Sequence, residues 1–312
     1  MTREILVAGE TLIDFIPDRP GPLAGVESFS RRAGGAPANV AVGLSRLDRT
    51  PWFCTVLATD SFGSHLAEVL DREGIPDRFV TREPERRTAL AFVSHGADGD
   101  RAFSFYRSDT ADRYLDTSVV DDGVLDGVEV VAVGGVSLTV EPARSATFDL
   151  VERARCRGCR VLFDPNVRPE LWETDPGPTI ERMLAETDVL KTTRDDLDGA
   201  GLPTTPSELL DAGPDVVLLT EGSAGARLLA AEGSPWGTGE WHHDGYRVDD
   251  VVDTTGAGDA FVAGAIAGLV DGYDPEPILA FANAVAAAST TRRGAMTALP
   301  DRGRVAEIRE GS

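Results

Sequence analysis

The second half of the chain alternates short, continuously apolar segments with amphipathic ones. From about residue 128, the segments that favour strands are "VEVVAVGG", "RVLFD", "DVLKT" and "DVVLLT", and those that favour the helices between them are "ARSATFDLVERAR", "TIERMLAE" and "SELLDAG". Strands without polar alternation are buried on both faces, and strands that alternate with helices form parallel sheets. "EILVAGE" near the start predicts a further buried strand, and residues 258–271 and 275–292 predict two long helices. We therefore predict an α/β fold whose central, mostly parallel sheet carries helices on both faces.

Two early segments do not fit this layer. Residues 13–35 and 86–108 favour extended structure, and "TALAFVSHGADGDRAFSFYR" predicts a hairpin around a Gly/Asp turn. We expect these segments to form a small β-sheet lid over the site, with residues 1–12, 36–85 and 109–312 as the core. "GARLLAA" and "GEWHHDGYRV" predict a late antiparallel pair at one end of the main sheet.

The charge of the chain is strongly acidic. Asp and Glu total 52 against 30 Lys and Arg, which gives a formal net charge of -22, and Lys191 is the only lysine. A solvated acidic surface keeps a protein soluble. We favour a halophilic interpretation, in which a salt-rich cytoplasm screens the self-repulsion. Either way the field repels nucleic acid and anionic lipid, so neither is expected as a partner.

The cysteines and the lengths of the apolar segments indicate the cellular compartment in which the protein is expected. Cys54, Cys156 and Cys159 do not make a disulfide framework, and "CRGC" between a helix and a strand favours a structural role over a redox or metal pair. The N-terminal residues predict a strand rather than a secretory signal, and no apolar run reaches about 18 residues. We expect a cytoplasmic protein.

The stretch "VVDTTGAGDAF", residues 251 to 261, joins a glycine turn to a carboxylate at the start of a helix. Gly256 and Gly258 permit unusual backbone angles, and the N–H groups of a helix N-terminus attract anions. Asp259 has two interpretations: it stabilises the helix, or it takes a proton from a hydroxyl while the turn holds developing negative charge. Phosphoryl transfer to an alcohol needs that second pairing. A Walker A loop is excluded because Lys191 lacks its context, and no dinucleotide-binding glycine pattern follows the first strand.

Two motifs identify a resemblance that covers essentially the whole chain. "DTTGAGDAF" resembles the C-terminal signature of the ribokinase-like (PfkB) family of sugar kinases, and "RRAGGAPANVAVGLSRL" resembles its N-terminal signature. Between them, "FDPNVRPELW", "LKTTRDDL", "LLTEGSAGA" and "NAVAAASTTRRGAM" match in order and spacing. The resemblance implies transfer of the γ-phosphate of ATP to a sugar hydroxyl, with Mg²⁺ and a monovalent cation such as K⁺. Lids of the family often pair between subunits, so a homodimer is a further expectation.

The resemblance also assigns residues. It implies that Asp259 is the catalytic base and that the N–H groups of Gly256, Ala257 and Gly258 form the anion hole. The sugar contacts that it implies are Asp14, Gly34, Gly35 and Asn39. The residues that it places on the nucleotide side are Thr193, Thr220, Gly222, Gly225 and Asn283.

The metal positions are implied in the same way. Asp253 and Thr255 fall where relatives bind a monovalent cation. The family usually has N-x-x-E after the strand "DVLKT", whereas this chain has Thr193 and Asp196. Asp196 keeps a carboxylate that can act on Mg²⁺ through water.

The sequence limits the identity of the sugar substrate less closely than it limits the reaction. "DPNVRPELW" and "FSFYR" resemble the fructokinase and 2-keto-3-deoxygluconate kinase branches. Arg107 and Arg168 suit the carboxylate of a sugar acid, hydroxyls or phosphate, or surface ion pairs. "VGGVSLTVEPARSAT" is more similar to fructokinases, so we expect a fructokinase-like enzyme, with 2-keto-3-deoxygluconate kinase as the alternative. An inactive sugar or nucleotide sensor is the alternative of another class. Glu10, after the first strand, fits a site role or a structural role equally well.

Overall fold

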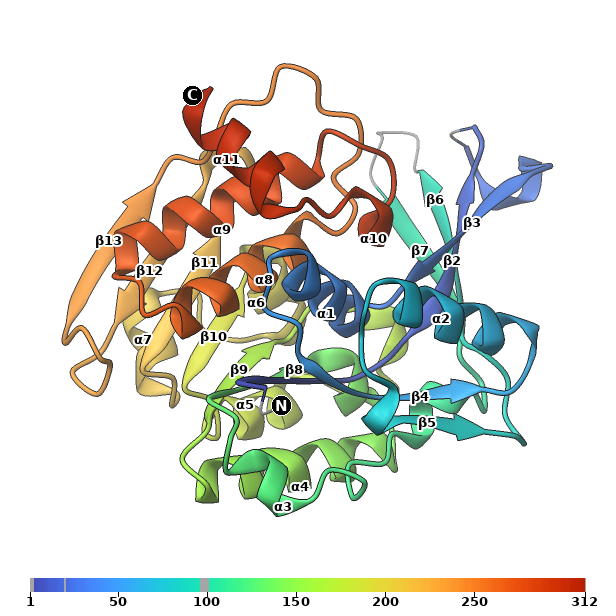
Figure 1. Ribbon diagram of the computed structural model, residues 1–312, viewed down its shortest axis with the longest axis horizontal. Coiled ribbons are helices and arrows are strands. Elements are labelled where there is room, and N and C mark those ends of the chain that lie inside the picture. Colours follow the sequence, from blue (N-terminus) through green and yellow to red (C-terminus); the bar gives the residue numbers. More distant parts are fainter. Residues whose placement is uncertain (1–2, 20, 96–100, 312) are drawn as a thin grey trace.

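The structure is a computed structural model that describes residues 3–19, 21–95 and 101–311. Its main sheet has nine strands, and seven of them run parallel (Figure 1). The last two, β12 and β13, are antiparallel at one edge, as the sequence predicted. In spatial order the strands are β13 (Gly239–His243), β12 (Ala226–Ala230), β11 (Val216–Thr220), β10 (Val189–Thr192), β9 (Arg160–Asp164), β8 (Val130–Gly134), β1 (Ile5–Ala8), β4 (Trp52–Ala58) and β5 (Val80–Glu83).

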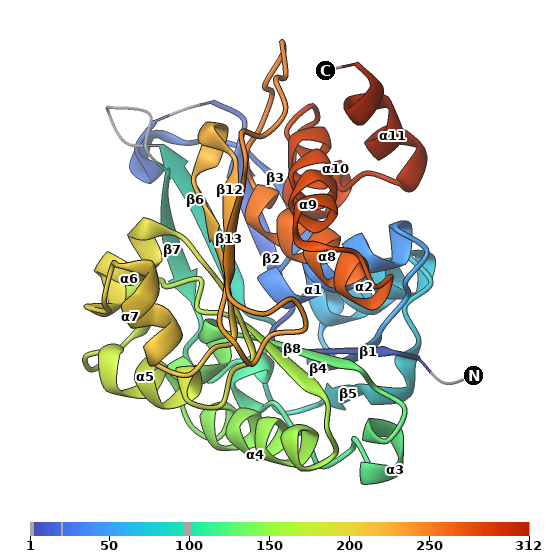
Figure 2. The ribbon, with the colours of Figure 1, turned by 90° about the vertical axis from the view of Figure 1, so that its left-hand side faces the viewer.

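Helices cover both faces of this sheet, which Figure 2 shows edge-on. Alternate residues of each strand enter opposite cores, because successive side chains of a strand point to opposite faces. Val7 and Ala132 lie in one core, for example, and Leu6 and Val133 lie in the other. One face carries α1 (Ala36–Arg46), α2 (Ser61–Arg72), α8 (Ala257–Val270), α9 (Pro275–Ser289), α10 (Ala295–Ala298) and α11 (Arg302–Glu310). The other carries α3 (Asp122–Leu125), α4 (Ala143–Cys156), α5 (Gly177–Leu184), α6 (Arg194–Ala200) and α7 (Pro206–Asp211).

Three helices of the first face pack unusually close together because their contacts are made by small residues. A Cβ added at Gly43 of α1 would lie 2.8 Å from the Cβ of Ala263 in α8. A Cβ at Gly264 of α8 would lie 2.8 Å from the Cα of Ala282 in α9. Larger side chains at these glycines would push the helices apart. The spacing matters because the N-termini of α1 and α8 meet at the candidate site.

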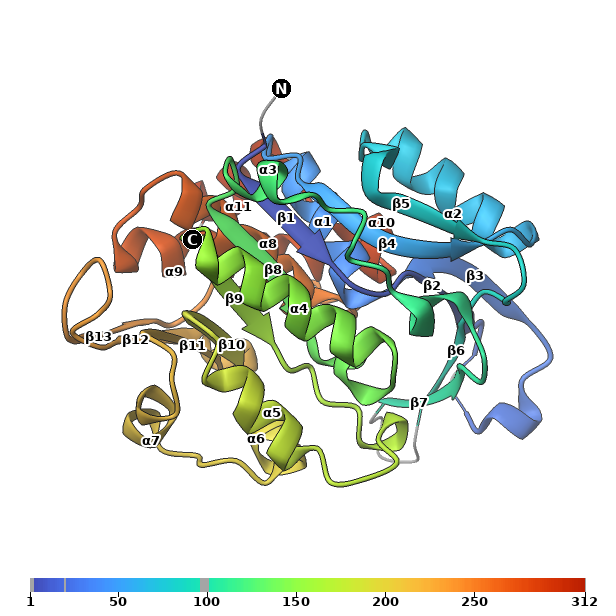
Figure 3. The same ribbon diagram turned by 90° about the horizontal axis from the view of Figure 1, so that it is seen from below.

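A second, four-stranded sheet stands beside the main one, at its right-hand end when seen from below in Figure 3. Its order is β3 (Phe29–Gly34), β2 (Leu12–Pro17), β6 (Leu90–His95) and β7 (Arg101–Tyr106), and only the β2–β6 pair is parallel. The Gly/Asp turn predicted between β6 and β7 lies at residues 96–100, outside the described residues. The predicted hairpin strands are otherwise present, and the α/β fold with a separate small sheet is confirmed.

The two faces of the small sheet differ in what they contact. Phe15 of β2 packs with Phe29 of β3 and Phe92 of β6, and Phe92 also contacts Tyr106 of β7. The opposite face carries Leu12, Asp14, Phe103 and Phe105 toward the main sheet, where they border a cavity. The small sheet therefore forms one wall of a space at the carboxyl ends of the parallel strands.

The cysteines and the apolar segments can now be compared with the structure. All three cysteines are free thiols, and the Sγ of Cys159 donates to the carbonyl of Leu125, so "CRGC" ends α4 and leads into β9. Among the described residues, no helix has both the length and the apolar composition that a membrane span requires.

Candidate active site

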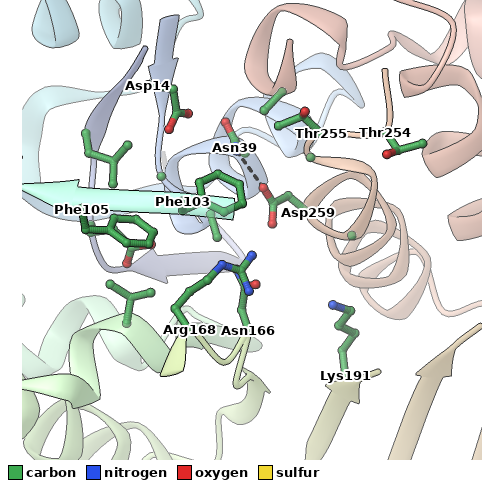
Figure 4. A pocket seen from close by; sticks show the side chains of 18 residues that line it. Asp14, Asn39, Phe103, Phe105, Asn166, Arg168, Lys191, Thr254, Thr255 and Asp259 are labelled. Carbon is green, nitrogen blue, oxygen red and sulfur yellow. Dashed lines mark hydrogen bonds between the residues drawn. The ribbon is translucent and has the colours of Figure 1, made fainter. Parts of the chain in front are cut away.

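A cavity of about 270 Å³ lies between the carboxyl ends of the central strands, the N-termini of α1 and α8, and the small sheet (Figure 4). Ligands of open α/β sheets bind at this edge. Its walls combine polar side chains from the strand ends with an aromatic face from β7. The lining residues are Glu10, Leu12, Asp14, Gly35, Ala36, Asn39, Phe103, Phe105, Val136, Asn166, Arg168, Lys191, Thr254, Thr255, Gly256, Gly258, Asp259 and Ala295.

The glycine turn before α8 has the geometry of an anion site. Gly256 is left-handed, with φ of 78°, and a Cβ there would lie 2.8 Å from the Cβ of Ala295, so both conformation and space require glycine. The N–H of Ala257 donates to the carbonyl of Thr254 at 3.2 Å. No described residue accepts a hydrogen bond from the N–H of Gly256 or Gly258. These donors, at the positive end of the α8 dipole, face the cavity and are available to an anion.

Asp259 lies in the first turn of α8 and points into the cavity (Figure 4). Its Oδ2 accepts a hydrogen bond of 2.7 Å from the Nδ2 of Asn39 in α1. Burial raises the pKa of Asp259 to about 6, although the Asn39 amide and the charges of Lys191 and Arg168 oppose the shift. A carboxylate with a pKa this close to neutrality is ionised at pH 7 and still a useful proton acceptor.

Lys191 lines the site, although it was assigned no role there from the sequence. It lies in β10, is only 4% exposed, and its Nζ donates to the Oδ2 of Asp164 at 3.0 Å. A Cβ built at Gly258 would lie 3.3 Å from that Nζ, so the ammonium lies against the glycine turn. Burial would lower the pKa of Lys191, but the carboxylates of Asp164, Asp196 and Asp259 outweigh it and raise the pKa, so the group is charged. One signal was available: the only lysine of the chain stands inside a buried strand.

The residues predicted to bind sugar mostly meet at the cavity. Asp14, Gly35, Asn39 and Arg168 line it. Gly34 does not, but a Cβ there would lie 2.0 Å from the Oδ2 of Asp14, so this glycine makes room for that carboxylate. Burial, with the charge of Asp259 nearby, raises the pKa of Asp14 to about 7.

The two arginines of interest lie in different environments. Arg168 lines the cavity, with its guanidinium 5.5 Å from the centre of the Phe103 ring and its Nη1 bonded to the carbonyl of Val167. Arg107 is buried outside the set of lining residues: its Nε donates to the Oδ2 of Asp112 at 2.6 Å, and its Nη1 donates to Thr139. Of the two predicted carboxylate readers, the structure therefore brings only Arg168 to the cavity.

The residues predicted to bind nucleotide do not line the cavity: four of them lie at or after the ends of β10 and β11, and the fifth, Asn283, lies in α9. Thr193 follows β10, Thr220 ends β11, and the Oγ1 of Thr220 donates to the carbonyl of Thr192. Gly222 and Gly225 have positive φ values of 62° and 91° in the loop after β11. Asn283 is buried in α9, where its Nδ2 donates to the carbonyl of Leu279.

The candidate metal residues are already engaged in hydrogen bonds. Asp196 accepts from the N–H of Val167 through Oδ1 and from the N–H and Oγ1 of Thr193 through Oδ2, as part of a capping box at the start of α6. Asp253 accepts from the N–H and Oγ1 of Thr255 and from the N–H of Gly294, which fixes the turn against the segment after α9. In the described part of the chain, no three His, Cys, Asp or Glu side chains are grouped closely enough to hold a metal ion by themselves.

Comparison with known proteins identifies the family of the chain. The model of the pfkB family carbohydrate kinases matches residues 2–302. The chain is 33% identical to a fructokinase of Vibrio alginolyticus over 309 residues, which cover 95% of this chain and 96% of the relative. It is similar to the structure of Xylella fastidiosa fructokinase with bound ATP, with a TM-score of 0.85, 31% identity and 98% of each chain covered.

A further solved structure is a fructokinase variant from Vibrio cholerae in a form with fructose, ADP and potassium ion bound. Its TM-score is 0.84 at 28% identity, over 99% of this chain and 98% of that one. The whole-chain family match, the fructokinase relatives and the architecture agree with one another. This chain belongs to the pfkB family of carbohydrate kinases, as an ATP-dependent sugar kinase that is fructokinase-like in sequence and fold.

Proposed function

We propose that this kinase transfers the γ-phosphoryl group of ATP to a hydroxyl of fructose, with Asp259 as the general base. The observation that carries the proposal is the position of a partly buried, cavity-facing carboxylate beside the N–H groups of the glycine turn and the ammonium of Lys191. A base and an anion site side by side are what phosphoryl transfer to an alcohol requires.

In the proposed reaction, Asn39 holds one oxygen of Asp259 so that the other faces the sugar hydroxyl. Asp259 takes the proton as the hydroxyl oxygen attacks the γ-phosphorus and the bond to the β-phosphate breaks. Negative charge on the transferring group then faces the N–H groups of Gly256 and Gly258 and the Nζ of Lys191. Such preorganised donors stabilise the transition state because they need no reorientation during the reaction.

The residues near the nucleotide side fit a magnesium ion only indirectly. Both oxygens of Asp196 are used within the protein, so Asp196 would act on the ion through bound water. Bound with the nucleotide, Mg²⁺ would neutralise charge on the β- and γ-phosphates. Thr193, Thr220, Gly222, Gly225 and Asn283 are proposed to hold the nucleotide, and the loop that contains Asp253 and Thr255 is proposed to hold potassium.

The charges of the cavity favour a neutral sugar over a sugar acid. Asp259 lines it as a carboxylate, and Glu10 and Asp14, with pKa values raised to about 7, are ionised in part at neutral pH. The cations are Arg168 and Lys191, and Lys191 is already paired with Asp164. A carboxylate of the substrate would be repelled by Asp259 and would depend on Arg168 as its partner. These contacts support fructose over 2-keto-3-deoxygluconate, which stays the second candidate because Arg168 reaches the cavity.

We assign a lid role to residues 13–35 and 86–108, with the rest of the chain as the core. Phe103 and Phe105 would cover the sugar and exclude the water that competes as phosphoryl acceptor. The opposite face of the lid carries the aromatic cluster that includes Tyr106, which is 63% exposed, so a homodimer through this face is part of the proposal.

The first prediction concerns the base. Asp259→Asn should lower kcat on fructose by about 10²- to 10⁴-fold, because it keeps the shape of the side chain and removes the proton acceptor. Release of ADP is measured with fructose, 2-keto-3-deoxygluconate and ribose, with ATP and Mg²⁺ in potassium chloride. Asp71→Asn, an exposed residue of α2, is the matched control. Sugar binding without turnover by the unmodified enzyme would instead identify a sensor, and normal turnover by Asp259→Asn would place the base elsewhere.

The second prediction concerns pH. Because Asp259 must be ionised to act and its pKa is raised to about 6, kcat/KM should fall as pH drops through about 6. Asn39→Ala removes a hydrogen bond that favours the ionised form, so the acidic limb should move to higher pH. The measurement is the pH profile of kcat/KM for both proteins. If Asn39→Ala lowers kcat/KM but leaves the acidic limb of the pH profile at the same pH, Asp259 does not control that limb.

The third prediction concerns salt. We propose that the net charge of -22 reflects a salt-rich cytoplasm. Raising potassium chloride from 0.05 to 0.5 M should then raise Tm by several degrees, because screening shortens the reach of surface repulsion below about 10 Å. Sucrose at equal osmolality controls for preferential exclusion. A Tm that is equal at both salt concentrations would contradict the halophilic interpretation.

A further inference from the structure

Glu10 follows β1 and borders the cavity, yet none of the roles above uses it. The residue is only 4% exposed. Its Oε2 is buried and has no hydrogen-bond partner among the described residues. An unpaired carboxylate oxygen is costly to bury, so an ionisable side chain at this position needs an explanation.

Arg107, whose charge acts on Glu10, also has a buried polar group without a hydrogen-bond partner. Arg107, at the end of β7, uses its Nε on Asp112 and its Nη1 on Thr139, while its Nη2 is buried and unpartnered. Burial raises the pKa of Glu10 to about 7, and the charge of Arg107 acts against the rise without a direct ion pair. Arg107 thus limits the rise in the pKa of Glu10 without bonding to it, and near pH 7 the carboxyl is ionised in part.

The same cavity holds other acceptors without donors. The Oδ1 of Asn39 is also buried and unpartnered, and the carboxyl of Asp14 lines the cavity. Glu10, Asn39 and Asp14 thus bring oxygen acceptors to the wall of the cavity, although protein atoms cover the Oε2 of Glu10 and the Oδ1 of Asn39. A ligand that complements them must carry several donors, and hydroxyl groups are neutral donors that cost little to desolvate beside carboxylates.

We propose that Glu10 is a specificity-determining residue: its carboxylate accepts a hydrogen bond from a sugar hydroxyl other than the one that is phosphorylated. This inference rests on the proposed function. With Asp259 engaging the reacting hydroxyl, a second fixed acceptor sets how the sugar is turned and hence which hydroxyl reaches the base. In its ionised form this group only accepts hydrogen bonds, so it discriminates against sugars that lack that hydroxyl and leave the carboxylate unpaired.

The test combines Glu10→Gln with a series of monodeoxy analogues of fructose. For fructose, kcat/KM should fall about 10- to 100-fold, the range expected for a hydrogen bond to a charged group. For one analogue, the unmodified enzyme should already be slow and Glu10→Gln should cause little further loss, because the shared interaction is absent in both cases. Glu152→Gln, an exposed position on α4, is the matched control and should change neither value.

Two kinetic results would overturn the inference: unchanged kinetics of Glu10→Gln on fructose, or an equal loss on fructose and on every analogue, which would indicate a structural role. Tm and the affinity for ATP are measured alongside. If Glu10→Gln does not fold, Glu10→Asp keeps the charge, withdraws it by one methylene and should show the same analogue-selective loss.

A binding readout separates this inference from the proposed function. The rise in Tm caused by each sugar is recorded without ATP, so it does not require turnover. A fructose-dependent rise that Glu10→Gln loses, with no turnover by either protein, would support Glu10 and contradict the kinase. The absence of any sugar-dependent rise in the unmodified protein would overturn the role of Glu10.

Discussion

The hydrogen bond from Asn39 to Asp259 joins residues 220 positions apart, and the rest of the site is arranged around it. It connects the first turn of α1 to the first turn of α8, so both helices must begin at the same edge of the sheet. That requires close packing along their length, which the small side chains at Gly43 and Ala263 permit. The tight contact of α8 with α9 at Gly264 then fixes α8 from its other side. The packing of these helices in the core therefore also determines the geometry of the site.

Several charged side chains lie close to the N-terminus of α8, whose position this helix packing fixes. Lys191 pairs with Asp164, and the negative charges of Asp196 and Asp259 also raise its pKa. A buried ion pair is weak evidence of stability, since desolvation offsets much of the attraction. The pair instead places a preorganised cation beside the glycine turn, where the phosphoryl group is proposed to bind. The small sheet adds an aromatic wall to the cavity, and the strand ends add acceptors.

Much of the fold could be predicted because it depends on local patterns. Uninterrupted apolar strands separated by helices specify a buried parallel sheet, and the glycine turn before Asp259 is visible in the sequence. The positions of Lys191 and Arg107 could not be predicted in the same way. Lys191 depends on Asp164 at the end of the adjacent strand β9. Arg107 pairs with nearby Asp112, and the path of the loop after β7, which also brings Thr139 to it, turns it away from the cavity. Sequence reveals that a charge is present, but strand register and loop paths decide what it faces. Glu10 remained open between two interpretations for the same reason.

The central claim is that Asp259 and the glycine turn act together on one reacting hydroxyl. A crystal structure with fructose and a non-hydrolysable ATP analogue tests it most directly. We expect a sugar hydroxyl within hydrogen-bond distance of Asp259, and the γ-phosphate on the N–H groups of Gly256 and Gly258 with the Nζ of Lys191 beside it. A sugar bound away from Asp259, or a γ-phosphate that makes no contact with the turn, would contradict it.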